Sequence, residues 1–432
     1  MLNCRENRTL LSLAASEGWH IFQSDITQAF TYGSLNGVDI FCYPPPGVPC
    51  PPGKVLKLER AVYGLKQAPT AFKACLTAFF RKQGFTPAND AETVWVKRVG
   101  KAVLIHCMFV DDILHCTNDK TLYHEFRKAF EKEFKIKSQD HVNLFLGIQV
   151  QSDRAKGTVS MNQSHYIDSC LEKFGLSSAK EVSKPITDRL SKTDQPATVD
   201  SAAQERYRGI VGSLLYLANW TRVDMAFAVS DLSRFVANPG AVHMVAAQRV
   251  FRYLKKTKNF SLNFSRPSDL NSLERPNVLW GYVDSDWAGC PDSRRSTSGY
   301  VLMLNGAAVS WRSKRQSTVA LSTAEAEFVA ASLLVQEVIY LRKLLTNMGF
   351  PQTEPTVIFE DNECCVAWSE GSVGGSERAK HIDLRKHFVH DAVQAKILKL
   401  QKIDSKNNAA DLLTKALDQD LVATHRKHCM GL

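Results

Sequence analysis

Two adjacent aspartates, Asp111 and Asp112, interrupt an apolar stretch of the sequence, HCMFVDDILHC. The flanking segments, 103–110 and 113–116, are rich in β-branched and aromatic residues and predict the two strands of a hairpin. Aspartate is common in turns because its side chain bonds nearby backbone, so a structural role is one interpretation. A metal site is the other, because two carboxylates held this close repel each other unless a cation lies beside them.

A third carboxylate, Asp25, ends the alternating segment 19–25, which predicts a strand, and Phe30 follows soon after it. Three carboxylates are enough to hold two Mg²⁺ ions, which keep some of their waters and bind substrate phosphates. Two such ions activate an attacking oxygen and stabilise a leaving oxygen in an in-line displacement. This set of residues therefore predicts nucleotidyl transfer.

Four further acidic residues stand in the motifs GYVDSDWAG, STAEAEF, IFEDNECC and NNAADLLTK, and they are Asp284, Glu327, Asp361 and Asp411. Each has an ordinary explanation by itself, since strand ends and helix starts favour Asp and helix faces favour Glu. Asp286 is an alternative to Asp284, because a shift of two residues keeps the same strand face. Glu325 is likewise an alternative to Glu327.

Length and charge narrow the class of protein. A chain of 432 residues is too long for one ordinary core and predicts two or three domains. From Trp280 onward there are 18 basic and 18 acidic residues, so the whole net charge of +10 lies upstream and favours a polyanionic partner. No apolar run approaches the roughly 18 residues of a membrane span, so neither a membrane partner nor a targeting segment is expected. Eleven cysteines without a CxxC pair suggest a reducing, intracellular setting.

The elements that would position these residues follow from hydrophobic periodicity. The Pro-rich segment 44–53 predicts a loop, and segment 177–204, rich in Ser, Lys, Asp and Pro, predicts a linker. The strongest patterns predict strands at 144–150, 356–360 and 397–403, a hairpin at 300–311, and helices at 71–82, 122–134, 166–174, 207–217, 241–256 and 323–348.

The motifs FQSDITQAF, KVLKLERAVYGLKQAPTAF, FVDDIL and LFLGIQV resemble, in the same order, the palm motifs of the reverse transcriptase of copia-type LTR retrotransposons. The resemblance implies that Asp25, Asp111 and Asp112 are catalytic metal ligands. It also implies that Phe30 is the aromatic gate that clashes with a ribose 2′-OH, and that Gln67 lies beside the incoming nucleotide.

The sequence departs from the family pattern in three places. Thr70 stands where the family usually has arginine, and Phe109 stands where a tyrosine often precedes the Val-Asp-Asp string. In the family a fingers segment with basic residues that grip template and triphosphate precedes the first motif, whereas only 24 residues precede Asp25 here. We therefore expect a reverse transcriptase truncated at its fingers, which bears on polymerase activity because phosphate contacts supply much of the affinity for nucleic acid.

From about Trp280 to the end the chain resembles the RNase H of the same elements, through YVDSDWAGCPDSRRSTSGY, FEDN, RAKHIDLRKHF and ADLLTK. That fold gathers four carboxylates around two metals, which implies metal-ligand roles for Asp284, Glu327, Asp361 and Asp411. The implied reaction is hydrolysis of the RNA strand of an RNA–DNA hybrid. The stretch DSKNNAAD lacks the histidine that many cellular RNases H carry there, which implies slow turnover.

Basic residues near these motifs predict a nucleic-acid interface. Arginine forks onto phosphates, and the aromatic faces of Trp287 and Trp311 can lie along a sugar. An ordinary solvated surface is the alternative for each single residue. Near the RNase H motifs these residues are Arg294, Arg295, Arg312 and Lys314. The segment HMVAAQRVFRYLKKT resembles the family's connecting region, which implies the same role for Arg252 and Lys255.

The sequence thus predicts a multidomain α+β and α/β chain. Its expected parts are a reverse-transcriptase palm with an antiparallel sheet and helices over 1–176, a linker with thumb- or connection-like helices over 177–279, and an RNase H-like α/β domain over 280–432. The expected function is that of an RNA-directed DNA polymerase and RNase H of a retrotransposon polyprotein. Two alternatives stay open. One is a truncated, non-catalytic relic that at most binds nucleic acid, and the other is a chain with RNase H activity alone.

The resemblance also implies cofactors and partners. Two Mg²⁺ ions per active site are expected, with Mn²⁺ as a substitute. The implied partners are an RNA template, a DNA primer, an RNA–DNA hybrid, deoxynucleoside triphosphates and other products of the polyprotein. The family works in cytoplasmic particles and acts on DNA bound for a nucleus, so the resemblance leaves both locations open.

Overall fold

The computed structural model describes residues 4–35, 37–267, 275–371 and 380–432, without the side chains of 380–383. The chain divides into two compact units. The N-terminal unit comprises Met1–Glu6 and Trp19–Phe145, and the C-terminal unit comprises Asn7–Gly18 and Leu146–Leu432. Helix α1 (Cys4–Glu17) runs across the boundary between the two segments. In the part of the chain that is described, we find no helix with the length and apolar character of a membrane span.

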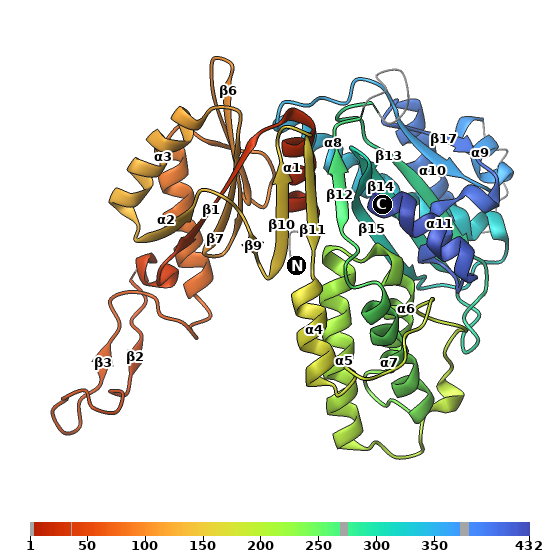
Figure 1. The fold of residues 1–432 in the computed structure, drawn as a ribbon, viewed down its shortest axis with the longest axis horizontal. Coiled ribbons are helices and arrows are strands. Elements are labelled where there is room, and N and C mark those ends of the chain that lie inside the picture. Colours follow the sequence, from red (N-terminus) through yellow and green to blue (C-terminus); the bar gives the residue numbers. More distant parts are fainter. Residues whose placement is uncertain (1–3, 36, 268–274, 372–379) are drawn as a thin grey trace. The chain divides into compact units, whose positions relative to one another are not determined.

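The N-terminal unit is built on a six-stranded sheet with the order β4-β5-β6-β7-β1-β8, in which all neighbouring strands are antiparallel (Figure 1). Two helices, α2 (Ala68–Lys82) and α3 (Lys120–Glu133), contribute six aromatic side chains to its core. The strands are β1 (His20–Ile26), β4 (Thr86–Pro87), β5 (Val94–Val99), β6 (Ala102–Phe109), β7 (Asp112–Thr117) and β8 (Ile136–Gln139). The predicted hairpin is therefore confirmed as β6 and β7.

Shorter elements complete this unit. A 3₁₀ turn, η1 (Ala29–Tyr32), follows β1. Strands β2 (Phe41–Cys42) and β3 (Leu56–Lys57) form an arm that carries the predicted Pro-rich loop at its end (Figure 1).

The predicted strand 144–150 is wrong as a single element. The structure has two short strands, β9 (Leu144–Phe145) and β10 (Ile148–Asp153). Leu146 and Gly147 between them have φ angles of 51° and 76°. Positive φ cannot continue a strand, so the apolar composition concealed a turn.

The first part of the C-terminal unit packs four helices around one core: α4 (Ser164–Lys173), α5 (Ser201–Trp220), α6 (Ala226–Leu232) and α7 (Ala241–Lys256) (Figure 1). Strands β10, β11 (Thr158–Asn162) and β12 (Leu262–Ser265) pair antiparallel beside them. Short 3₁₀ turns connect the helices, namely η2 (Lys192–Asp194), η3 (Val223–Met225) and η4 (Ser233–Phe235).

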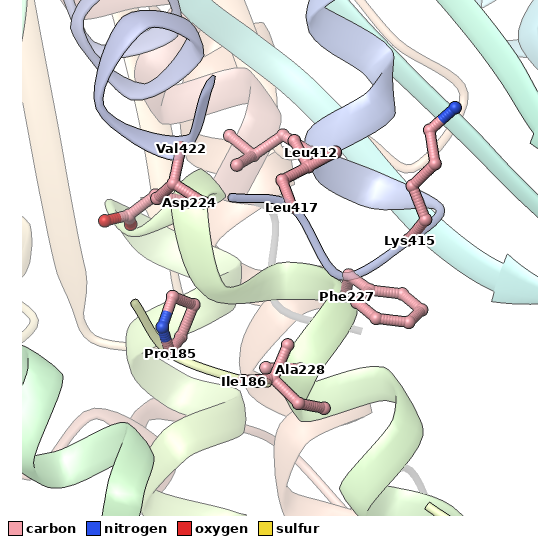
Figure 2. A pocket seen from close by; sticks show the side chains of 9 residues that line it. All are labelled: Pro185, Ile186, Asp224, Phe227, Ala228, Leu412, Lys415, Leu417 and Val422. Atoms are coloured by element: carbon pink, nitrogen blue, oxygen red, sulfur yellow. The ribbon is translucent and has the colours of Figure 1, made fainter. Parts of the chain in front are cut away.

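The segment predicted as a linker packs onto this core. Ile186 and Leu190 are buried within it, although the segment has little regular structure. Pro185 and Ile186 face Phe227 and Ala228 of α6 across a pocket of about 10 Å³, roughly the space of one water (Figure 2). The segment therefore does more than connect two domains.

A buried ion pair just after α5 is held against the end of α7. Arg222 Nη2 lies 2.7 Å from Asp224 Oδ2, and both side chains are at most 1 % exposed. The Tyr253 hydroxyl donates to the same oxygen at 2.5 Å, and Thr257 accepts two hydrogen bonds from Arg222. Burial alone would raise the pKa of Asp224, but the charge and hydrogen bonds of Arg222 outweigh it and lower that pKa.

We expect Arg222→Met to lower the free energy of unfolding by about 3–5 kcal/mol, because it leaves the Asp224 carboxylate buried without its cation. Urea denaturation followed by circular dichroism measures this loss. Lys258→Met is the matched control, since Lys258 pairs with Asp168 at 2.9 Å on the surface and such pairs contribute about 0–1 kcal/mol. Equal losses for the two variants would contradict a structural role of the buried pair.

The second part of the C-terminal unit contains a five-stranded mixed sheet with the order β15-β14-β13-β16-β17. Strands β13, β14 and β15 are antiparallel, whereas β16 is parallel to β13 and β17 is parallel to β16. The strands are β13 (Trp280–Asp286), β14 (Thr297–Leu304), β15 (Ala307–Arg315), β16 (Thr356–Glu360) and β17 (Leu398–Lys402).

Helix α8 (Thr323–Asn347) packs on β13 and β14, and α10 (Lys380–Gln394) packs on α8 (Figure 1). The predictions for β16 and α8 are confirmed, α8 ending one residue before the expected end. Between β16 and β17 the described residues form two helices, α9 (Glu363–Glu370) and α10. The chain ends with η5 (Ser405–Asn407), η6 (Ala409–Leu413) and α11 (Gln419–Met430).

Candidate active sites

The predicted N-terminal carboxylates meet at one end of neighbouring strands. Asp25 near the end of β1 is the direct cross-strand partner of Asp112 at the start of β7. Asp111 lies in the two-residue loop of the β6–β7 hairpin, and its carbonyl accepts a hydrogen bond of 3.0 Å from the backbone N–H of Ile26. The antiparallel register thus brings residues far apart in the sequence to one edge of the sheet.

The tip of this hairpin has an unusual backbone. Val110, which precedes Asp111, has a φ angle of 56° and an exposed side chain. A β-branched residue rarely adopts this conformation, which costs on the order of 1–3 kcal/mol. The sheet on both sides of the loop holds the strained turn, and the turn in turn places Asp111 beside the end of β1.

Burial and neighbouring negative charges raise the pKa values of Asp25 and Asp112. Burial and the charge of Asp111 raise the pKa of Asp25, which Lys137 lowers in part. Burial also raises the pKa of Asp112, although a hydrogen bond of 3.3 Å from Gln23 Nε2 lowers it in part. Among the described residues, however, these three do not offer oxygens that all lie within 4.8 Å of one another. The backbone therefore aligns the predicted ligands, while their oxygens remain spread.

The two predicted nucleotide-binding residues lie in different surroundings. The Phe30 ring packs against Tyr63, with centroids 4.6 Å apart, whereas Gln67 is exposed just before α2. Tyr63 was not predicted from the sequence, although it belongs to the YGLKQAP string. Burial raises its pKa, and Asp111 and Asp25 raise it further, so its hydroxyl faces the carboxylates.

The C-terminal carboxylates form two overlapping groups. Asp284 of β13, Asp361 just after β16 and Asp411 of η6 offer oxygens that lie within 4.8 Å of one another. Glu327 of α8 forms a second such group with Glu360 and Asp361. Asp361 belongs to both groups and thereby connects the four predicted carboxylates. Glu360 was not predicted.

A glycine and an asparagine bring the last of these elements close. Gly299 of β14 is the cross-strand partner of Asp284, and a Cβ at Gly299 would come within 2.8 Å of Leu413 Cβ. The missing side chain therefore lets η6 pack directly on the strand. Asn408 Nδ2 donates to the Val283 carbonyl at 2.9 Å and fixes the start of the same turn.

The electrostatics of the C-terminal site are dominated by burial. Burial raises the pKa of Glu327 well above its usual range and raises that of Asp284 as well. Burial and then the charge of Asp284 raise the pKa of Asp411 to about 7. Lys415 Nζ opposes the shifts of Asp411 and Asp284, lying 2.7 Å from Asp411 Oδ1 and 4.0 Å from Asp284 Oδ2.

The residues of the C-terminal site suit a divalent cation. Their ligand atoms are carboxylate oxygens, the kind that Mg²⁺ and Mn²⁺ prefer. Glu327 Oε2 and Glu360 Oε2 are buried and have no hydrogen-bond partner among the described residues. A buried carboxylate oxygen without a donor is costly unless a cation or a proton lies beside it.

The two alternative ligands are engaged elsewhere. Arg189, from the predicted linker, donates to Asp286 Oδ2 and, at 2.5 Å, to the Thr414 carbonyl. Glu325 caps α8, since its carboxylate accepts a hydrogen bond of 2.7 Å from the Leu321 N–H. Neither belongs to the two carboxylate groups, so the geometry favours Asp284 and Glu327.

The predicted basic residues differ in their availability. Arg252 and Lys255 donate to the carbonyls of Lys180 and Ala179, so they hold the predicted linker against α7. Trp311 donates to the Ala218 carbonyl, whereas Trp287 is about half exposed. The remaining predicted basic residues lie on or beside β14 and β15, three of them exposed and Arg295 half-buried: Arg294, Arg295, Arg312 and Lys314.

We expect Asp411→Asn to stabilise the metal-free chain, and to do so more at about pH 7.5 than at about pH 5. The folded state raises this pKa from 3.8 to about 7, so it retains a proton that the unfolded chain releases between those values. Stability from that proton is complete below the unfolded value and is lost as pH rises through about 7. The difference in the free energy of unfolding between Asp411→Asn and wild type should grow by roughly 1–3 kcal/mol from about pH 5 to about pH 7.5, since one pKa unit corresponds to about 1.4 kcal/mol.

Urea denaturation in EDTA measures this dependence, and the difference from wild type cancels contributions from other titrating groups. Asp418→Asn is the control, because the Asp418 side chain is 94 % exposed. A stability difference between Asp411→Asn and wild type that stays constant with pH would contradict the raised pKa.

Comparisons with known sequences identify the family to which the chain is similar. The family described as "Reverse transcriptase (RNA-dependent DNA polymerase)" matches residues 3–188. The Retrovirus-related Pol polyprotein from transposon TNT 1-94 of Nicotiana tabacum is 35% identical over 96% of this chain and 31% of its own length. That from transposon RE1 of Arabidopsis thaliana is 34% identical over 95% of this chain and 27% of its own length. The chain thus spans less than a third of these relatives.

Solved structures of the foamy viral protease-reverse transcriptase share the fold. The complex with an RNA/DNA hybrid has a TM-score of 0.50 and 11% identity, covering 92% of this chain and 45% of that one. A complex with ds DNA has a TM-score of 0.51 and 10% identity, covering 94% and 60%. The predicted fold class, a reverse-transcriptase palm followed by helices and an RNase H-like α/β domain, is confirmed. By its sequence, the chain belongs to the reverse-transcriptase family of copia-type retrotransposon Pol polyproteins.

Proposed function

We propose that this chain is an RNA-directed DNA polymerase with ribonuclease H activity that acts on RNA–DNA hybrids. The observation that carries the proposal is the gathering of Asp284, Glu327, Asp361 and Asp411 from four elements, in a chain of this family. The foamy viral enzyme was solved with an RNA/DNA hybrid and with ds DNA, which supports the same classes of nucleic acid as partners here.

In the proposed RNase H site, the chain's own residues hold ions and orient the RNA. Asp361 belongs to both carboxylate groups and would therefore contact both ions. Asp284 and Asp411 would contact one of the two ions, and Glu327 would contact the other. Bound Mg²⁺ or Mn²⁺ supplies activation of the attacking oxygen and charge for the leaving oxygen. Exposed Arg294, Arg312 and Lys314 would contact phosphates of the hybrid, and the Trp287 face would lie along a sugar.

In the proposed polymerase site, Asp25, Asp111 and Asp112 at the edge of the antiparallel sheet would hold the ions. Phe30 would exclude a ribose 2′-OH from a bound deoxynucleoside triphosphate, with Gln67 beside the nucleotide. Tyr63 supports Phe30 from one side through ring contact and faces Asp111. A Tyr63 substitution would therefore affect both the gate and the electrostatics of the hairpin tip.

One observation favours a narrower function, RNase H activity alone. The C-terminal carboxylates offer oxygens within 4.8 Å of one another, whereas the N-terminal three, all of them described, do not. A chain that binds hybrid without catalysis is the remaining alternative. The experiment must therefore read the two reactions separately.

The test uses purified chain, Mg²⁺, four deoxynucleotides, and a recessed DNA primer on an RNA template, with a different dye on each strand. We expect a longer primer and a shortened template on one gel. A shortened template beside an unextended primer would leave RNase H as the function. If folded protein changed neither strand, the proposal would fail and the non-catalytic alternative would stand.

A further inference from the structure

The C-terminal site holds one carboxylate more than its four predicted ligands. We propose that Glu360 is a fifth carboxylate of this site, which holds a divalent cation together with Glu327 and Asp361. This inference rests on the proposed RNase H function and deepens it. It assigns the two carboxylate groups to two separate cation positions, one with Asp284 and Asp411 and one with Glu360 and Glu327, that share Asp361.

The geometry brings Glu360 to the site from the end of a central strand. Glu360 is the last residue of β16, which is parallel to both β13 and β17. Its carboxylate, that of Glu327 from α8 and that of Asp361 each offer an oxygen within 4.8 Å of the other two. Three carboxylate oxygens at this separation can ligate one Mg²⁺ or Mn²⁺, with waters and substrate oxygens completing its shell.

The burial of Glu360 points to a ligand that the chain itself does not provide. Its side chain has no exposed surface, and that of Glu327 is 5 % exposed. Glu360 Oε1 accepts a hydrogen bond of 2.9 Å from the Asn362 N–H. Glu360 Oε2 and Glu327 Oε2 have no partner among the described residues. Two buried carboxylates with unpartnered oxygens are stable together only beside a cation or a shared proton.

The two carboxylate groups differ in the cations that the chain offers them. Lys415 Nζ lies 2.7 Å from Asp411 and 4.0 Å from Asp284, so the first group has an internal positive charge. In the second group, no described side chain forms an ion pair with Glu327, Glu360 or Asp361. Lys402 donates to the backbone carbonyl of Asp361 and not to its carboxylate. The second group therefore depends more on a cation from solution.

A shared proton is the competing explanation, and cation binding separates the two. If Glu360 stayed protonated and served only to bond Glu327, Glu360→Gln would keep the hydrogen bonds and leave cation binding unchanged. If Glu360 is a ligand, the same variant removes one of three negative oxygens from the cation position. The isosteric substitution thus changes charge with little change in shape.

The experiment titrates the full chain with Mn²⁺ by calorimetry and compares Glu360→Gln with Glu363→Gln. Glu363 is exposed in the first turn of α9 and serves as the matched control. We expect Glu360→Gln to bind one ion fewer per chain than the control, or to bind one ion about tenfold or more weakly. We also expect it to melt at a higher temperature in EDTA and to gain less from added Mn²⁺.

Glu360→Asp provides a second variant, because it keeps the charge but retracts the oxygens by one methylene. It should lose the same ion, and should do so even if Glu360→Gln did not fold. Identical Mn²⁺ binding by the control and by the folded Glu360 variants would overturn the inference while the proposed function stood. A wild-type chain that binds no Mn²⁺ would overturn both.

Discussion

Asp361→Asn is expected to reduce RNA cleavage by about 10²–10³-fold and to leave primer extension unchanged. Asp361 contributes an oxygen to both carboxylate groups of the C-terminal site, so its loss weakens both proposed cation positions at once. Its other contacts are peripheral, since Ser405 donates to its Oδ2 at 2.6 Å and the amide can still accept that bond. Single-turnover cleavage of an end-labelled RNA in a hybrid gives the rate.

Glu363→Gln is the control for this prediction, as it removes an exposed carboxylate two positions away in the same segment. It should cleave RNA at the wild-type rate. Cleavage by Asp361→Asn within a factor of a few of wild type would mean that Asp361 is not a ligand of the catalytic ions. A loss of primer extension in the same variant would mean that the two sites are not independent.

Asp111→Asn is expected to have the opposite effect, a fall of about 10²–10³-fold in single-nucleotide incorporation with unchanged RNA cleavage. Asp111 lies in the strained hairpin loop, where it faces Asp25 and the Tyr63 hydroxyl. Asparagine keeps the size of the side chain and is well tolerated in turns, so the hairpin should keep its shape. The variant therefore changes the charge of the site and little else.

The control for the second prediction is Asp39→Asn in the same unit. Asp39 pairs with Lys57 at 2.6 Å, with both side chains more than half exposed, so its charge matters little. Incorporation by Asp111→Asn at the control rate would remove the hairpin from the proposed polymerase site. Measuring both reactions for all four variants forms one matched experiment on the two sites.

Local sequence patterns predicted most elements that carry the candidate sites. The apolar runs around Asp111 and Asp112 specify the hairpin, and the periodicity of α8 and β16 specifies those elements nearly to the residue. These predictions hold because side-chain alternation and helical periodicity are properties of neighbouring residues. The turn at Leu146–Gly147 was missed because its composition is that of a strand.

The choice between neighbouring candidates could not be made from the sequence. Asp284 and Asp286 lie on the same face of β13, and the structure separates them through Arg189, which lies 97 residues before Asp286. The Glu325 carboxylate accepts a hydrogen bond from the Leu321 N–H, which distinguishes it from that of Glu327. Both distinctions depend on hydrogen bonds that no periodicity records.

Glu360 shows where prediction from the sequence ends. Strand alternation would place two neighbouring residues such as Glu360 and Asp361 on opposite faces of a sheet. β16 ends at Glu360, and Asp361 lies beyond the strand, where alternation no longer applies. Similarly, the sequence gives no sign that Lys415 of ADLLTK belongs to the site. The packing of η6 against Gly299 places it beside Asp284.

The sequence by itself determined most of the strands and helices that carry the candidate residues, because local sterics and hydrophobic periodicity decide those elements. It also carried the motifs that place the chain in its family. Only the tertiary structure decided which carboxylates meet, which are buried, and which have a lysine or arginine as partner. Those outcomes depend on strand register and on contacts between distant segments, and the energy of a charge depends on the burial that they produce.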